Sequence, residues 1–305
     1  MYKYILKKII MMIPVLIGMT IIVFLILHLS PGDPVEMIAG PRASPEVYNN
    51  IRTHLGLDQP LIVQYAVFIK NILKGNLGVS ILQHRPVIDL IKERLPITLD
   101  LGLSVLVVSF LIAVPIGIIA AVHRNTWADY LVMSGALVGI SMPTFWFGLI
   151  LMYIFAYKLR WFPIAGYGTW KHLVLPVVAM SLNDTAITAR MVRSSMLEVI
   201  KQDYIRTARS KGLAERVVIY GHALKNALIP VITLLGLKIG WILGGSVVIE
   251  IVFNRPGIGR LMVDSIFARD YPVVQGSMLV LTTTIILGNV LADVLYAVVD
   301  PRIKY

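Results

Sequence analysis

The residues of this chain whose types and spacing could do chemistry are few, and most of them lie in one polar segment between two long apolar runs. Residues 203–215 read Asp-Tyr-Ile-Arg-Thr-Ala-Arg-Ser-Lys-Gly-Leu-Ala-Glu. Asp203 is typical of a helix N-cap, and Gly212 is typical of the left-handed residue that ends a helix. We therefore predict a short helix over residues 204–211 that ends at Gly212, after which Leu213 begins a second amphipathic helix.

The composition of this predicted helix suits one of two roles. Thr207 and Ala208 are small enough for another surface to approach closely, and the basic residues around them would fit an acidic groove. An ordinary basic loop between membrane spans would only fix the topology of the chain. The combination of cap, small residues and terminating glycine favours the first role, in which the helix docks into a partner protein. The basic residues of the predicted helix are Arg206, Arg209 and Lys211.

Long apolar runs flank this segment and recur along the chain. The 305 residues are 57% hydrophobic and 15% charged, with a mean hydropathy of +0.78, whereas a soluble domain carries about 25% charged residues. Apolar runs longer than 18 residues predict transmembrane helices. We predict an all-α membrane protein with six spans, over residues 9–29, 97–122, 130–157, 172–189, 226–249 and 273–299.

The distribution of basic residues orients these spans. Segment 190–225 holds eight Lys/Arg against three acidic residues, whereas segment 30–95 holds seven against six. Lys and Arg concentrate in cytoplasmic loops, and three lysines also precede the first span. We therefore predict an uncleaved first span, with both termini and segment 190–225 in the cytoplasm. The net charge of +11 follows from this bias, so no nucleic-acid partner is indicated.

The segment after the first span carries helix signals of its own. Ser44 and Pro45 are typical of a cap followed by proline at the first helical position. Pro60 and Pro86 open two further stretches with helical periodicity, which we expect to form helices outside the membrane. The predicted division is residues 1–30 (cytoplasmic tip and first span), 31–95 (extracytoplasmic helical segment, with helices over 61–73 and 87–95), 96–299 (spans two to six, with the polar loop at about 194–225) and 300–305 (cytoplasmic tail).

Ionisable residues inside the predicted spans indicate a polar path. Lys238 falls at the centre of the fifth span, where a lysine costs about 2.5–3.5 kcal/mol and should face a bundle interior or a wet cavity. Asp184, which follows Asn183 in the fourth span, and Asp293 in the sixth are candidate partners. A candidate translocation path, in which Lys238 meets a substrate carboxylate, consists of Ser141, Asn183, Asp184 and Lys238. A structural ion pair, or a partner in another subunit, is an equal alternative for Lys238.

A row of glycines follows the same predicted span. Gly236, Gly240, Gly244 and Gly245 form a small-residue stripe that allows close helix packing, although a face that slides past its neighbour would use the same residues. Glu250 ends the span, and we expect it to be a charge at the outer membrane interface.

Enzymatic chemistry is not indicated by the sequence. It has neither a G-x-x-x-x-G-K-[ST] phosphate loop nor an H-E-x-x-H metal motif. It contains no cysteine, so disulfides and thiol catalysis are excluded. We expect no catalytic, cofactor-binding or metal-binding residues. A stand-alone secondary transporter would need its own coupling-ion site or inverted repeats, and no repeat is visible.

The polar segment resembles the EAA loop of ABC-importer permeases, in the version of the dipeptide/oligopeptide branch. Residues 207–212 read Thr-Ala-Arg-Ser-Lys-Gly, which places the glycine four residues after the alanine, and residues 222–230 continue the pattern. Arg206 and Thr207 replace the glutamate and first alanine of the general motif, and Lys225 stands where proline is common. Segments that resemble the B-type half of the family are 31–34, 55–60, 75–80, 141–146, 253–260, 269–275 and 300–303.

The resemblance implies a permease subunit of the prokaryotic cytoplasmic (inner) membrane. A homologous second, C-type permease would complete the pore, two cytoplasmic ATPases would bind ATP and Mg, and an extracytoplasmic binding protein would deliver substrate. The branch carries di- and oligopeptides, our first choice, or nickel chelates or glutathione. The resemblance assigns the ATPase-coupling role to Tyr204, Arg206, Thr207, Ala208, Arg209, Lys211, Gly212 and Leu213.

Overall fold

The computed structural model describes residues 2–29, 35, 44–54 and 56–299, without the side chains of 2–9, 26–29, 51, 54, 237, 239–245 and 293–299. The predicted segments 31–34 and 300–305 therefore lie outside the described residues. Over the described ranges the chain is helical and has no strands, which confirms the all-α prediction. Four of the described helices are long and apolar enough to cross a membrane, or five if one bent pair counts as a single span. The predicted total of six is not confirmed.

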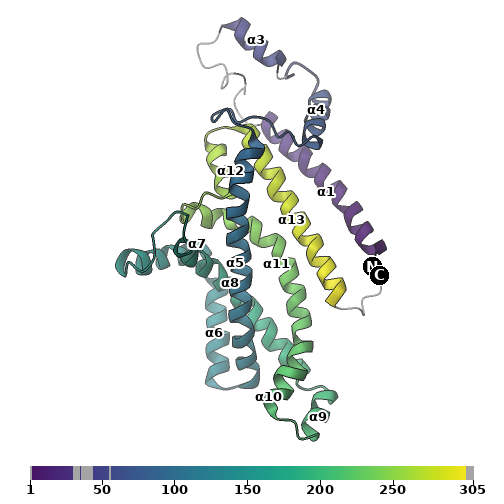
Figure 1. Ribbon diagram of the computed structural model, residues 1–305, viewed down its shortest axis with the longest axis vertical. Helices are drawn as coiled ribbons and strands as arrows, with labels where there is room; N and C mark the ends of the chain where they lie inside the picture. The colour runs from purple at the N-terminus through teal and green to yellow at the C-terminus, as the bar shows by residue number, and fades with distance from the viewer. Residues whose placement is uncertain (1, 30–34, 36–43, 55, 300–305) are drawn as a thin grey trace.

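The long helices run side by side, and shorter helices lie at both ends of the bundle (Figure 1). Helices α3 and α4 lie at one end of the bundle, and α9 and α10 lie at the opposite end. In chain order the elements are α1 (Tyr2–Leu29), α3 (Pro45–His54), α4 (Leu61–Leu73), α5 (Val87–Val122), α6 (Trp127–Ser141), α7 (Thr144–Leu151), the π-helical η1 (Met152–Lys158), α8 (Lys171–Val199), α9 (Asp203–Ser210), α10 (Glu215–Val217), the π-helical η2 (Val218–Ala223), α11 (Leu224–Val252), α12 (Ile258–Phe267) and α13 (Tyr271–Val299).

The helices expected outside the membrane begin where the sequence predicts. Ser44 precedes α3, and its hydroxyl accepts a hydrogen bond from the backbone N–H of Val47. Pro60 precedes α4, which ends before Lys74 and Gly75. The stretch after Pro86 differs, because it is the first part of α5, which continues without a break to Val122. The outer segment and the second span thus share one helix, and the fourfold division of the chain stays a prediction.

The predicted third span turns sharply at Pro143. Met142 is extended (φ −88°, ψ 123°), and Pro143 lacks the N–H that would continue the helix. Helices α6 and α7 are bent by 103° at this point, far more than a kink within one continuous span. Gly148 of α7 lies against Phe253 beyond the end of α11, where a Cβ would meet the phenyl ring at 3.0 Å. Packing of α7 against that residue holds the turned segment in place.

Helices α5 and α8 form the centre of the bundle because small residues let them approach closely. A Cβ at Gly117 would lie 2.6 Å from the Cβ of Val192, so only glycine fits at this contact. Gly236 of α11 lies against Ala292 of α13 in the same way, with 3.0 Å to the alanine Cβ. Gly236 therefore has the packing role predicted for the glycine stripe. Gly240, Gly244 and Gly245 lie outside the residues whose side chains are described.

The prediction that Glu250 lies at the outer membrane interface is wrong, because its side chain is fully buried in the protein. Its carboxylate accepts hydrogen bonds from the Thr98 hydroxyl (2.6 Å), the Ser246 hydroxyl (3.2 Å) and the backbone N–H of Arg260 (3.0 Å). A buried carboxylate requires such partners. The segment after α11 folds back over Glu250, so this residue fastens α12 to α11 and α5.

Gly257 provides a direct test of this arrangement. A Cβ at Gly257 would lie 2.3 Å from the Glu250 carboxylate, so Gly257→Ala must displace the carboxylate from its donors. We expect a destabilisation of about 1–3 kcal/mol or more and a melting temperature lower by several degrees for the purified protein in detergent. Gly135→Ala is the matched control, since nothing lies within 4 Å of its Cβ position. An unchanged melting temperature for Gly257→Ala would contradict the packing described for Glu250.

Candidate functional site

A cavity of about 550 Å³ lies beside the break between α6 and α7. All four residues of the predicted translocation path line it, although they come from α6, α8 and α11. The structure thus brings together side chains that are up to 97 residues apart in the sequence, from Ser141 to Lys238. The lining residues are Ile140, Ser141, Met142, Pro143, Thr144, Met180, Asn183, Asp184, Ile187 and Lys238.

Lys238 and Asp184 form an ion pair in the wall of this cavity. The Lys238 Nζ lies 2.7 Å from Asp184 Oδ1, and it also donates to the Asp184 carbonyl (3.2 Å) and the Thr188 hydroxyl (3.4 Å). The Lys238 side chain is 12% exposed and that of Asp184 is 21% exposed. The pair is therefore shielded but still reached from the cavity. Of the two candidate partners, Asp184 is the one that pairs, while the side chain of Asp293 lies outside the described residues.

Asn183 and Ser141 support the wall of the cavity at the break. The break leaves the carbonyl groups at the end of α6 without helical partners. The Asn183 amide donates a hydrogen bond to the Ile140 carbonyl at 3.3 Å, and the Ser141 hydroxyl donates to the Leu137 carbonyl at 2.9 Å. Asn183 thereby stabilises the end of α6, in addition to facing the cavity. The translocation role of these residues stays a prediction.

Helix α9 matches the predicted short helix, with its start displaced by one residue. Gln202 occupies the N-cap position without a side-chain capping bond, and Asp203, the predicted cap, is the first helical residue. Gly212 follows with φ +77°, as predicted for the terminator, and its N–H bonds to the Arg209 carbonyl at 2.9 Å. The second helix begins at Glu215, beyond the predicted Leu213, and continues through η2 into α11.

One face of α9 is buried in the protein itself. Ile205 is fully buried and Ala208 is 7% exposed, and both belong to a core cluster that includes Val192 and Met196 of α8. The small size of Ala208 therefore serves contact within this chain, which corrects the expectation that it faces a partner. The same cluster includes residues of α5, η2 and α11. Helix α9 thus packs directly on the bundle.

The opposite face of α9 is open to solvent. Arg206 and Thr207 are exposed there, together with Lys211 and Leu213 of the following turn. Tyr204 is 41% exposed, and its hydroxyl accepts a hydrogen bond from the Asn226 amide at 2.7 Å, which ties α9 to α11. This face is free to bind a partner, and the coupling role of its residues stays a prediction.

Arg209 forms an ion pair with Glu215 across the turn at Gly212. Its guanidinium donates to both oxygens of Glu215, at 3.1 and 2.6 Å. The hydrogen bond to Glu215 raises the pKa of Arg209. Because both side chains are more than a third exposed, the pair adds little stability. It joins α9 to the first residue of α10 across the turn at Gly212.

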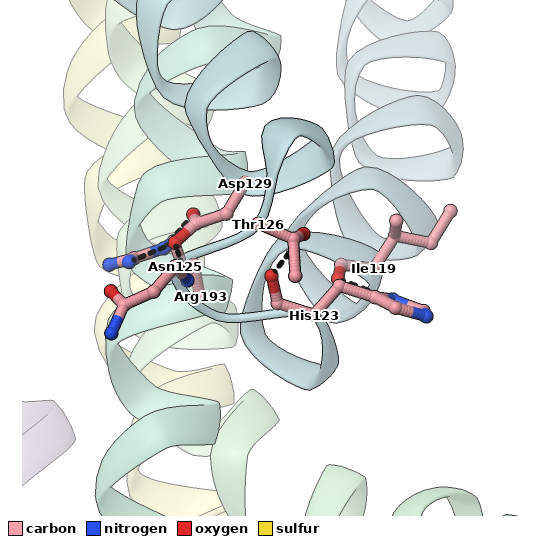
Figure 2. A network of polar contacts seen from close by, with 6 residues as sticks. All are labelled: Ile119, His123, Asn125, Thr126, Asp129 and Arg193. Atoms are coloured by element: carbon pink, nitrogen blue, oxygen red, sulfur yellow. Dashed lines mark hydrogen bonds and ion pairs between the residues drawn. The ribbon is translucent and has the colours of Figure 1, made fainter.

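A partly buried ion pair that the sequence did not indicate lies at the end of α6 opposite the break (Figure 2). Arg193 of α8 donates to both oxygens of Asp129 in the first turn of α6, at 2.6 and 2.7 Å. Asp129 is 2% exposed and also accepts the backbone N–H of Asn125 at 3.0 Å. Asn125 has φ +62°, a left-handed turn conformation that asparagine tolerates, but this local signal does not indicate the pairing of Asp129 with Arg193.

Comparisons with known proteins agree along the whole chain. Residues 113–305 match the family described as "Binding-protein-dependent transport system inner membrane component", and residues 1–102 match its N-terminal companion family. A protein of Salmonella paratyphi A named "Glutathione transport system permease protein GsiC" is 46% identical over 305 residues, covering all of both chains. Its namesake in Escherichia coli (strain K12) is 44% identical over the same length.

Solved structures support the same fold at low sequence identity. A chain from "Inward facing conformations of the MetNI methionine ABC transporter" has a TM-score of 0.59 and 18% identity, covering 69% of this chain and 96% of that one. A chain of an amino acid ABC transporter has a TM-score of 0.53 and 16% identity, covering 70% and 94% respectively. At such identities the likeness concerns the fold alone.

Proposed function

The chain belongs to the family of binding-protein-dependent transport system inner membrane components, and we propose that it forms half of the pore of an ABC importer for small peptides. A homologous permease completes the pore, and an extracytoplasmic binding protein delivers the substrate. Two cytoplasmic ATPases bind ATP and Mg, and α9 lies in a cleft of one of them. The chain is a multi-pass inner-membrane protein with both termini in the cytoplasm, and it is not itself an enzyme.

The observation that carries this proposal is the cavity containing the Lys238–Asp184 pair. A peptide presents both an ammonium and a carboxylate group, and an ion pair of opposite signs can exchange partners with such a zwitterion. Ionisable residues inside the spans of a membrane protein generally mark a substrate or ion path. The apolar side chains of Met142, Met180 and Ile187 around the pair would contact the rest of the peptide.

Glutathione is the first peptide to test. The relatives that match over their full lengths carry glutathione in their names. Glutathione is a tripeptide with an ammonium group and carboxylates, so it fits the chemistry of the Lys238–Asp184 pair. A nickel chelate is the second substrate to test, because the branch that the sequence resembles includes nickel importers. A stand-alone secondary transporter is disfavoured by the family to which the chain belongs.

Transport then follows from an exchange between two arrangements of the bundle. Closure of the ATPase dimer on ATP moves α9, whose buried Ile205 displaces the core cluster of α8, η2 and α11. The cavity lies between α6, α8 and α11, so relative movement of these helices changes the side to which it opens. Substrate released by the binding protein crosses when the cavity changes sides.

The test is uptake into proteoliposomes that contain the complete complex. ATP hydrolysis and uptake are measured with binding protein that is empty or loaded with glutathione, a dipeptide or a nickel chelate. We expect ATP-dependent uptake that requires the binding protein, with loaded protein stimulating hydrolysis for the peptides. If only binding protein loaded with the nickel chelate stimulates hydrolysis, the substrate is a nickel chelate and not a peptide. Uptake by this chain without ATPases would overturn the importer assignment.

A further inference from the structure

We propose that the Asp129–Arg193 ion pair couples α8 to the first turn of α6, so that movement of α9 reaches the far end of α6 through this pair and reaches the break that lines the cavity together with the contacts of α8 near the break. This inference rests on the proposed function, since it concerns how ATP hydrolysis in partner subunits is coupled to transport. Asp129 and Arg193 are positioning residues in this scheme, because neither lines the cavity nor lies on the exposed face of α9.

The first step runs from α9 to α8 through the hydrophobic core. Ile205 and Ala208 are buried in one cluster with Val192 and Met196 of α8. Val192 and Met196 are both fully buried, so any displacement of α9 must displace this part of α8. Protein interiors are close-packed and transmit such displacements without absorbing them in voids.

The second step runs from α8 to α6 through the ion pair. Arg193 follows Val192 directly and lies within one helical turn of Met196, so it moves with the residues that contact α9. Its guanidinium holds Asp129 through two parallel bonds, an arrangement that fixes orientation as well as distance. The backbone N–H of Asn125 makes a third bond to the same carboxylate and so includes the turn between α5 and α6 (Figure 2).

The third step runs along α6 to the cavity. Asp129 lies in the first turn of α6, and the break at Met142 and Pro143 lies at the other end of this 15-residue helix. Near the break α8 holds α6 again, since Asn183 bonds to the Ile140 carbonyl and a Cβ at Gly139 would meet Leu182 at 3.3 Å. Helix α6 thus contacts α8 at both ends. In the proposed scheme, α6 therefore moves together with α8.

A purely structural ion pair would have different consequences. Loss of a structural pair lowers the amount or the thermal stability of the complex, but each assembled complex still moves the normal amount of substrate per ATP. Loss of a coupling link lowers the amount of substrate moved per ATP in complexes that assemble normally. The ratio of uptake to hydrolysis therefore separates the two roles.

The experiment measures this ratio in proteoliposomes of the complete complex with glutathione-loaded binding protein. For Asp129→Asn we expect ATP hydrolysis to persist and the ratio to fall by about 5-fold or more. For Arg193→Lys, which keeps the charge but loses the two parallel bonds, we expect a smaller fall. The exchanged pair Asp129→Arg/Arg193→Asp is expected to recover part of the ratio. Glu93→Gln, which breaks the exposed pair between Arg85, just before α5, and Glu93 in the N-terminal part of α5, is the control and should leave the ratio unchanged.

Two outcomes would overturn the inference. One is a normal ratio in both Asp129→Asn and Arg193→Lys. The other is a loss of assembled complex in proportion to the loss of uptake, with no recovery in the exchanged pair, which would make the role structural. Absence of ATP-driven uptake in the wild-type complex would instead count against the proposed function, so the two failures are distinguishable.

Discussion

Replacing Gly212 by valine is expected to abolish the stimulation of ATP hydrolysis by loaded binding protein while leaving the permease in the membrane. Gly212 has φ +77°, and nothing lies within 4 Å of its Cβ position, so the obstacle is the backbone conformation and not space. A β-branched residue in this conformation costs about 1–3 kcal/mol. The turn relieves this strain by changing the angle between α9 and α10, which moves the exposed face of α9 away from its partner.

Graded substitutions at Gly212 isolate the conformational cause. Asparagine tolerates the left-handed region, so Gly212→Asn should retain most of the stimulation, and Gly212→Ala should be intermediate. The measurement is hydrolysis in the purified complex, together with the amount of ATPase that remains bound to the permease. Normal stimulation in Gly212→Val would contradict the role assigned to the turn.

Replacing Lys238 by methionine is expected to reduce substrate uptake at least 10-fold. Methionine leaves the Asp184 carboxylate in the shielded wall of the cavity without its cation. Removal of one member of a buried pair costs about 3–5 kcal/mol, and an uncompensated negative charge also repels a substrate carboxylate. Uptake in proteoliposomes at saturating ATP is the measurement, with ATP hydrolysis recorded in parallel.

The double variant Lys238→Met/Asp184→Asn separates the two roles open to this lysine. It removes both charges, so a pair that only holds α8 and α11 together is no longer left unbalanced, and uptake should recover. If Lys238 binds the substrate carboxylate, uptake stays low in the double variant although the complex assembles. We expect the second result. Full recovery would make the pair structural, and normal uptake in Lys238→Met alone would exclude both roles.

Local signals in the sequence predicted the parts of the structure that depend on local chemistry. Pro60, Ser44 and Gly212 mark the helix ends at which they were predicted, because caps and terminators act within a few residues. Asp184 was one of two candidate partners of Lys238 and is the one that pairs with it, because a charge inside a span has few ways to be compensated. The one-residue shift at Asp203 is within the usual uncertainty of a helix end.

The features that the sequence did not predict depend on contacts between distant segments. Glu250 was expected at an interface because the return of residues 253–260 over it is a tertiary event, although Gly257 and Gly259 mark the close approach. A single span was predicted over residues 130–157, whereas the chain turns by 103° at Pro143 and α7 packs against the distant Phe253. Ala208 is small because α9 lies on the core of its own chain.

In the proposed importer, a cytoplasmic ATPase holds the exposed face of α9. The chain contains no cysteine, so a single cysteine at Thr207, carrying a photoactivated cross-linker, gives a unique probe on that face. The matched control is Ala208→Cys, one residue away and only 7% exposed. We expect Thr207→Cys to cross-link to an ATP-binding subunit in the assembled complex, with a yield that changes on addition of ATP, and we expect no such cross-link from Ala208→Cys. A complex that takes up substrate normally yet gives no cross-link from Thr207→Cys would contradict the proposed contact.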